Sequence, residues 1–172
     1  MKLLFISLGC DKNLVDSEEM LGMLAADGHE IVDDEDEAEV IIVNTCCFIG
    51  DAKEESVNTI LEMAEKKKAG TCKVLIVTGC MAQRYKKEIS EEIPEVDAIL
   101  GTTSYGDISK AVKEAQAGRH FEEYKSIDFL PDISGKRMLT TGGHFAYLKI
   151  AEGCDKHCTY CIIPKVRGNY RS

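Results

Sequence analysis

Short apolar runs alternate with longer amphipathic stretches along the first 118 residues. The runs are rich in β-branched residues, as in 40–43, which is typical of buried strands. The longer stretches repeat apolar residues at helical spacing, and Val57, Ile60, Leu61 and Ala64 share one stripe. The predicted strands are residues 2–7, 30–32, 39–44, 73–78 and 97–100, and the predicted helices are residues 14–27, 52–69, 82–92 and 105–117.

Strands that alternate with helices in this rhythm indicate βαβ units and a parallel sheet. Crossovers between parallel strands are almost always right-handed, which leaves few arrangements for five strands. We therefore expect an α/β fold with a small, doubly wound, five-stranded parallel sheet in the flavodoxin-like order 2-1-3-4-5. In that order the first, third and fourth strands are neighbours.

The rhythm stops after residue 118. Residues 119–143 mix polar residues with Pro131 and the pair Gly142-Gly143, as a connection between domains does. Residues 145–150 then form a new apolar run, Phe-Ala-Tyr-Leu-Lys-Ile, which predicts a fresh strand. The expected division is a domain over 1–118, a linker over 119–143, and the start of a second domain over 144–172.

Composition narrows the class of protein. The 172 residues carry a net charge of −9, and this negative field argues against direct binding of nucleic acid. The amino terminus resembles no signal peptide and no apolar run is long enough to cross a bilayer, so we expect a cytoplasmic protein without membrane contact. Eight cysteines in a reducing compartment are not expected to form structural disulfides.

Cys154, Cys158 and Cys161 have the spacing C-x3-C-x2-C just after the predicted strand. A short loop can gather three thiolates around one iron-sulfur cluster and leave one iron open for a substrate or cofactor. A zinc site that adds His157 is an alternative, but His157 directly precedes Cys158, and adjacent residues rarely face one metal. A ferredoxin-like site would need a fourth nearby cysteine, and none follows.

Cys10, Cys46 and Cys80 each come two to three residues after the end of a predicted strand. The carboxyl ends of neighbouring strands form the ligand crevice of a doubly wound sheet, so we expect these three thiols to meet there. Buried cysteines that serve only as small hydrophobic residues are the alternative, which explains each cysteine alone better than their shared position.

The loop over 154–161, with Tyr160 before its last cysteine, resembles the signature of the radical S-adenosylmethionine family. The resemblance implies that the open iron binds S-adenosylmethionine and that the backbone at Tyr160 lies by its adenine. It also implies that residues 144–172 are the first strand and cluster loop of a truncated radical-SAM barrel.

Residues 7–18, 44–49 and 78–85 resemble the three cysteine motifs of the methylthiotransferase amino-terminal domain within that family. The resemblance implies that Cys10, Cys46 and Cys80 hold an auxiliary [4Fe-4S] cluster. Gly9-Cys10-Asp11-Lys12-Asn13 and the tail 167–172 are similar to the branch that modifies an aspartate of a small-subunit ribosomal protein. The branch that modifies adenosine in transfer RNA is the alternative.

The expected function is therefore that of the amino-terminal part of a transferase. Two [4Fe-4S] clusters and S-adenosylmethionine would insert a methylthio group at the unactivated β-carbon of an aspartate, with electrons from a donor protein. Radical chemistry needs no acid or base there, so no catalytic side chain is expected, and this stretch alone is expected to be inactive. A cluster-bearing electron-transfer or sensor module is the alternative from another class.

Four other residues stand near the cysteine motifs or among the remaining cysteines. Cys47 is expected to be a packed thiol, because it should point away from its neighbour Cys46 in extended backbone. Cys72 receives no function. Asn13 either tunes a cluster by hydrogen bonding or forms a turn, and Arg167 belongs to a basic tail expected at the solvent surface.

Overall fold

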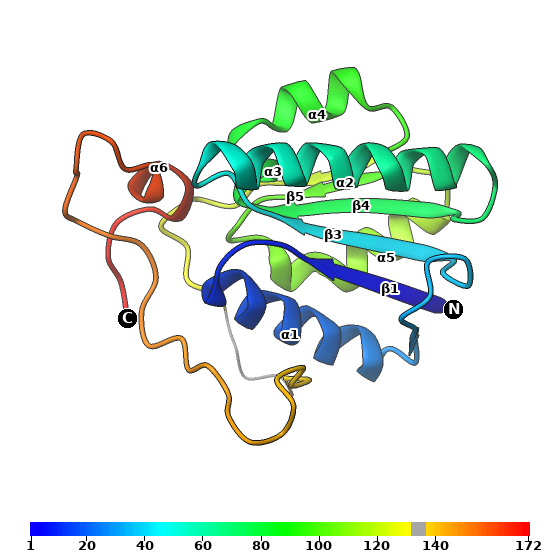
Figure 1. Cartoon of the computed structure of the whole chain (residues 1–172), viewed down its shortest axis with the longest axis horizontal. Coiled ribbons are helices and arrows are strands. Elements are labelled where there is room, and N and C mark those ends of the chain that lie inside the picture. Colours follow the sequence, from blue (N-terminus) through cyan, green and yellow to red (C-terminus); the bar gives the residue numbers. More distant parts are fainter. Residues whose placement is uncertain (132–136) are drawn as a thin grey trace.

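The computed structural model describes residues 1–131 and 137–172. Within those ranges, six parallel strands form one open sheet in the order β2-β1-β3-β4-β5-β6 (Figure 1). The strands are β1 (Lys2–Ser7), β2 (Glu30–Ile31), β3 (Val40–Thr45), β4 (Val74–Gly79), β5 (Ala98–Leu100) and β6 (Phe121–Glu123). The predicted α/β class and the order 2-1-3-4-5 of the first five strands are confirmed.

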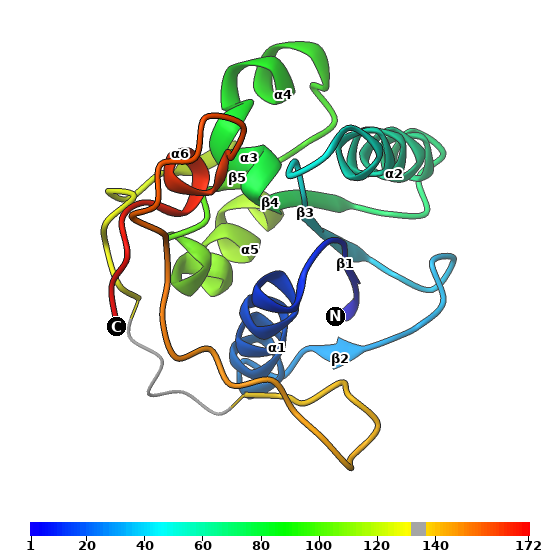
Figure 2. The same cartoon turned by 60° about the vertical axis from the view of Figure 1, so that its left-hand side comes forward.

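Helices cover both faces of the sheet, as Figure 2 shows. The helices are α1 (Asp11–Ala26), α2 (Gly50–Lys68), α3 (Cys80–Arg84), α4 (Lys86–Glu92), α5 (Ile108–Gln116) and α6 (Ile163–Arg167), with a 3-10 turn η1 (Tyr105–Asp107) before α5. One core lies between the sheet and α1 with α5, and it includes Met20, Leu24 and Ile108. The other lies between the sheet and α2, α3 and α4, and it includes Ile60 and Met63.

The two central strands, β3 and β4, are buried at every position. Ile41 and Val43 face one core while Val40 and Ile42 face the other, which explains why the strand reads as an unbroken apolar run. Burial of each such side chain contributes about 1.5–3 kcal/mol. This rigid centre fixes the ends of β1, β3 and β4 relative to one another.

Three local predictions were wrong. A sixth strand, β6, pairs with β5 inside the expected linker, and its short sequence Phe121-Glu122-Glu123 carries little apolar signal. The helix predicted over 82–92 is two helices, because the backbone leaves helical geometry at Tyr85, with φ −117° and ψ 35°. The strand predicted over 145–150 does not form.

Residues 145–150 have no strand beside them within the described part of the chain. An extended segment needs a neighbour to pair its backbone groups, so a β-rich sequence alone does not make a strand. Leu148 and Ile150 are accordingly 82% and 77% exposed. The division at residues 118 and 143 stays a prediction, and residues 132–136 of the expected linker lie outside the described residues.

The segment after residue 137 returns to the carboxyl ends of the strands, where α6 lies beside α3 (Figures 1 and 2). Val166 packs into the core between the sheet and helices α2, α3 and α4, here called the α2-side core. Its carbonyl oxygen accepts a 2.7 Å hydrogen bond from the Thr102 hydroxyl. An antiparallel bridge between Glu152 and Arg171 closes the segment on itself.

In the described ranges, no helix combines the length and apolar character needed to cross a membrane.

Candidate functional site

Three cysteines lie at the carboxyl ends of three neighbouring strands. Cys10 caps the start of α1 after β1, Cys46 follows β3 directly, and Cys80 opens α3 immediately after β4. All three line one cavity of about 810 Å³. The structure therefore brings together thiols that are 36 and 34 residues apart in the sequence, as the strand order predicts. Their role as metal ligands stays a prediction.

Glycines at two of these strand ends allow the close approach. Gly9 has φ +100°, and a Cβ there would lie 2.7 Å from Cβ of Cys46. Gly79 has φ +94°, and a Cβ there would lie 2.5 Å from the carbonyl oxygen of Thr45. Both positions need a left-handed backbone without a side chain. Glycine is thus what lets the first and third cysteine loops pack against the second.

Asn13 joins the same loops by hydrogen bonds. Its side-chain Nδ2 donates to the carbonyl oxygens of Leu8 and Thr45, both at 2.9 Å. Its Oδ1 accepts a 3.7 Å hydrogen bond from Sγ of Cys80. Asn13 is fully buried, so these contacts replace water and hold the three strand ends in register. Asn13 lies within α1 and joins these loops directly, and its role beside a cluster stays a prediction.

The cavity wall is mainly apolar and carries charges of both signs. Lys12 and Arg167 supply positive charge, and the exposed carboxylates Asp51 and Glu55 stand at the start of α2. The apolar lining residues include Leu8, Phe48, Ile49, Ala52, Ile162, Ile163 and Val166. Three thiols in a mainly apolar hollow fit a sulfur-ligated group, and the balanced charges of the wall do not by themselves select its charge.

Burial raises the pKa of the Cys80 thiol, while the Arg167 guanidinium beside it acts in the opposite direction. Burial likewise raises the pKa of Cys47 to about 11. The Cys47 thiol belongs to the α2-side core and donates to the carbonyl oxygen of Cys80 at 3.4 Å. Cys47 is therefore a packed thiol, as predicted, and Cys72 is also buried, with Sγ 3.1 Å from the carbonyl oxygen of Val74.

The second cysteine set lies on a loop stabilised by backbone contacts. Cys154 N–H donates to Gly168 at 3.1 Å and Cys161 N–H donates to Cys158 at 3.0 Å. Cys158 is exposed and the other two thiols are partly exposed. Tyr160 is 90% exposed. Ile162 follows Cys161 directly in the sequence and also lines the first cavity. The loop of the second cysteine set therefore leads straight into the wall of the cavity of Cys10, Cys46 and Cys80.

Neither cysteine set is preformed around a single ion. Within residues 1–131 and 137–172, no three His, Cys, Asp or Glu side chains stand close enough to hold one metal ion. Cys10, Cys46 and Cys80 instead surround a hollow, which suits a larger centre with soft thiolate ligands.

Sequence reasoning missed a group of buried charges beside the first cavity. Arg167 was expected at the solvent surface, and this was wrong, because Arg167 is buried between Asp16 and Glu152. A signal was present in α1, where Asp16 shares the buried stripe of Asn13 and Met20. A carboxylate on such a stripe requires a cationic partner, but the sequence does not say which one.

The chain is similar to a described protein family and to longer curated proteins. The family described as "Uncharacterized protein family UPF0004" matches residues 2–101. All 172 residues align at 64% identity with the protein named "Ribosomal protein uS12 methylthiotransferase RimO" of Lachnoclostridium phytofermentans, of which they cover 39%. The protein of the same name from Clostridioides difficile is 52% identical, again over the whole chain and 39% of its own length. The chain thus spans about two fifths of these relatives.

Proposed function

The chain belongs to the UPF0004 family, and from this premise we propose that it forms the amino-terminal part of a methylthiotransferase acting on ribosomal protein uS12. The names of its relatives support a methylthiotransferase. The observation that carries the proposal is the cavity at the ends of β1, β3 and β4, lined by Cys10, Cys46 and Cys80. If the three cysteines served only as small core residues, nothing would require all of them to lie at the ligand crevice of the sheet.

In this proposal Cys10, Cys46 and Cys80 hold one [4Fe-4S] cluster, and Cys154, Cys158 and Cys161 hold a second. Bound together with S-adenosylmethionine, these groups would supply the radical and sulfur chemistry that replaces hydrogen on an unactivated carbon. Because the loop supplies only three cysteines, its cluster would have one iron free to bind S-adenosylmethionine, and the backbone at Tyr160 would contribute to the adenine site.

Residues of this chain would bind the cluster at Cys10, Cys46 and Cys80, offset part of its charge and shield it from water. Lys12 and Arg167 line the cavity, and the Arg167 guanidinium lies beside the Cys80 thiol, where it favours the thiolate form. Ile162, Ile163 and Val166 cover the same cavity with apolar surface. They would exclude water from reactive sulfur.

The proposed substrate is the β-carbon of an aspartate in uS12, with a donor protein supplying electrons in the cytoplasm. Relatives named for uS12 support the protein-modifying branch over the branch that modifies transfer RNA. These parts of the proposal concern the whole enzyme, of which this chain spans about two fifths of the relatives' length.

The test uses a protein that carries this chain together with the remaining length found in its relatives. After anaerobic reconstitution with iron and sulfide, it is incubated with S-adenosylmethionine, a reductant, and either uS12 or transfer RNA. Mass spectrometry is expected to find uS12 heavier by one methylthio group in place of one hydrogen. The Cys154→Ala variant should give no product, and a modified transfer RNA or an unmodified uS12 would overturn the proposal.

A further inference from the structure

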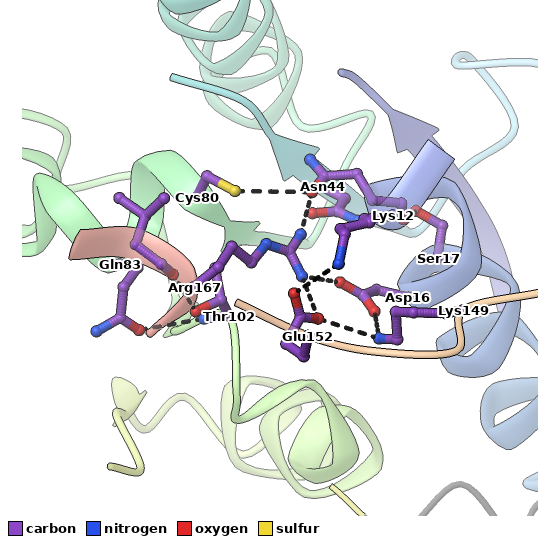
Figure 3. Close-up of polar contacts among 12 residues, drawn as sticks. Lys12, Asp16, Ser17, Asn44, Cys80, Gln83, Thr102, Lys149, Glu152 and Arg167 are labelled. Atoms are coloured by element: carbon purple, nitrogen blue, oxygen red, sulfur yellow. Dashed lines mark hydrogen bonds and ion pairs between the residues drawn. The ribbon is translucent and has the colours of Figure 1, made fainter. Parts of the chain in front are cut away.

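A buried ion cluster joins α1 to the segment that carries the second cysteine set (Figure 3). It consists of Asp16, Lys149, Glu152 and Arg167, with Lys12 at its edge. Asp16 accepts from Lys149 through Oδ1 and from Arg167 through Oδ2, the latter at 2.7 Å. Glu152 lies 3.1 Å from Arg167 and 3.4 Å from Lys149 through Oε2, and 3.5 Å from Lys12 through Oε1.

The ion cluster is almost fully removed from solvent. The side chains of Arg167, Asp16 and Glu152 are 4%, 5% and 7% exposed, and Lys149 is 10% exposed. Two cations and two anions therefore neutralise each other inside the protein. Removing one member leaves an uncompensated buried charge, which strongly destabilises the packing of the segment 149–167 against α1. These ion pairs join α1 to the segment 149–167.

Arg167 also reaches the first cysteine cavity. Its Nη2 donates to Oδ1 of Asn13, the same oxygen that accepts from Sγ of Cys80. Arg167 itself lines the cavity. Asp16, Glu152 and Asn13 thus surround one guanidinium, and a planar fork of donors serves three acceptors as a lysine ammonium cannot.

We propose that Arg167 is a positioning residue that fixes the loop of Cys154, Cys158 and Cys161 against the cavity of Cys10, Cys46 and Cys80. One side of its guanidinium binds Asp16 and Glu152, and the other binds Asn13 at the cysteine cavity. The two cysteine sets therefore keep one separation and orientation. The roles of the cysteines rest on the proposed function, whereas the attachment itself is a property of the metal-free protein.

Hydrogen exchange of the metal-free protein, followed by mass spectrometry, tests the attachment directly. In Arg167→Met, the amides of Glu152 and Cys154, which bond to Arg171 and Gly168, are expected to exchange at least about tenfold faster than in the unchanged protein. Amides of β3 and β4 should keep their protection, which shows that the fold survives. The control Arg119→Met removes an exposed ion pair with Glu114 and should change nothing. Unchanged exchange over residues 149–171 in Arg167→Met would overturn the proposal.

A second measurement separates positioning from mere stabilisation. In the reconstituted protein with both clusters reduced, their magnetic interaction depends on the distance between them. Arg167→Met is expected to weaken this interaction in the electron-spin spectrum without loss of iron, and Arg167→Lys to restore part of it. An interaction of unchanged strength in Arg167→Met would contradict the proposal. Failure of the unchanged protein to bind iron would instead defeat the proposed function and leave the exchange result standing.

Discussion

Replacing Cys10, Cys46 and Cys80 together by alanine is expected to remove about half of the iron that the reconstituted protein binds. The three thiols come from separate strand ends but line one cavity, so the variant loses every cysteine ligand of that centre. The loop of Cys154, Cys158 and Cys161 is left intact and should still hold its own cluster. Iron and acid-labile sulfide, measured per chain after anaerobic reconstitution, give the result.

The matched control is the double variant Cys47→Ala and Cys72→Ala. Both thiols are buried in the apolar part of the structure, and neither lines the cavity. The control should bind as much iron as the unchanged protein, despite losing two cysteines. If the triple variant kept its full iron content, or if the control lost as much as the triple variant, the cavity would not be a cluster site.

Replacing Cys154, Cys158 and Cys161 by alanine is expected to abolish the response of the clusters to S-adenosylmethionine. Each cysteine set supplies three ligands, which leaves one iron without a thiolate. The thiols of this loop are exposed or partly exposed, whereas Cys46 and Cys80 are buried, so we expect S-adenosylmethionine to reach the iron of this loop. In the unchanged reconstituted protein, adding S-adenosylmethionine should alter the electron-spin spectrum. In the variant, about half the iron should remain and the spectrum should not change.

This second experiment also separates an enzyme from an electron-transfer module. A module that only exchanges electrons has no need of an open iron, so its spectrum would be silent towards S-adenosylmethionine even in the unchanged protein. A response that persisted in the Cys154, Cys158 and Cys161 variant would place S-adenosylmethionine at the other cysteine set and contradict this prediction.

The sheet could be predicted from the sequence because its signals are local. Buried strands such as β3 and β4 are continuous apolar runs, and right-handed crossovers then leave few orders for them. That order was enough to predict that Cys10, Cys46 and Cys80 lie together at the carboxyl ends of the strands. The strand β6 was missed because two of its three residues are glutamates, and a short edge strand depends on its partner β5.

The ion cluster could not be predicted because its members are far apart in the sequence. Arg167 is 151 residues from Asp16, and in the sequence it stands among Lys165 and Arg171, where a solvent-exposed tail is the natural interpretation. Its burial depends on how the segment after residue 137 returns to the sheet. Residues 145–150 illustrate the same limit, since their β-rich composition forms a strand only where another strand can pair with it.

The proposed function requires two separate iron centres in this chain, one at the carboxyl ends of β1, β3 and β4 and one on the loop of Cys154, Cys158 and Cys161. Anomalous scattering at the iron absorption edge, from crystals of the anaerobically reconstituted protein, tests it most directly. Two iron peaks are expected, the first among Cys10, Cys46 and Cys80 and the second at Cys154, Cys158 and Cys161. A single peak, or iron bound away from either cysteine set, would contradict the account.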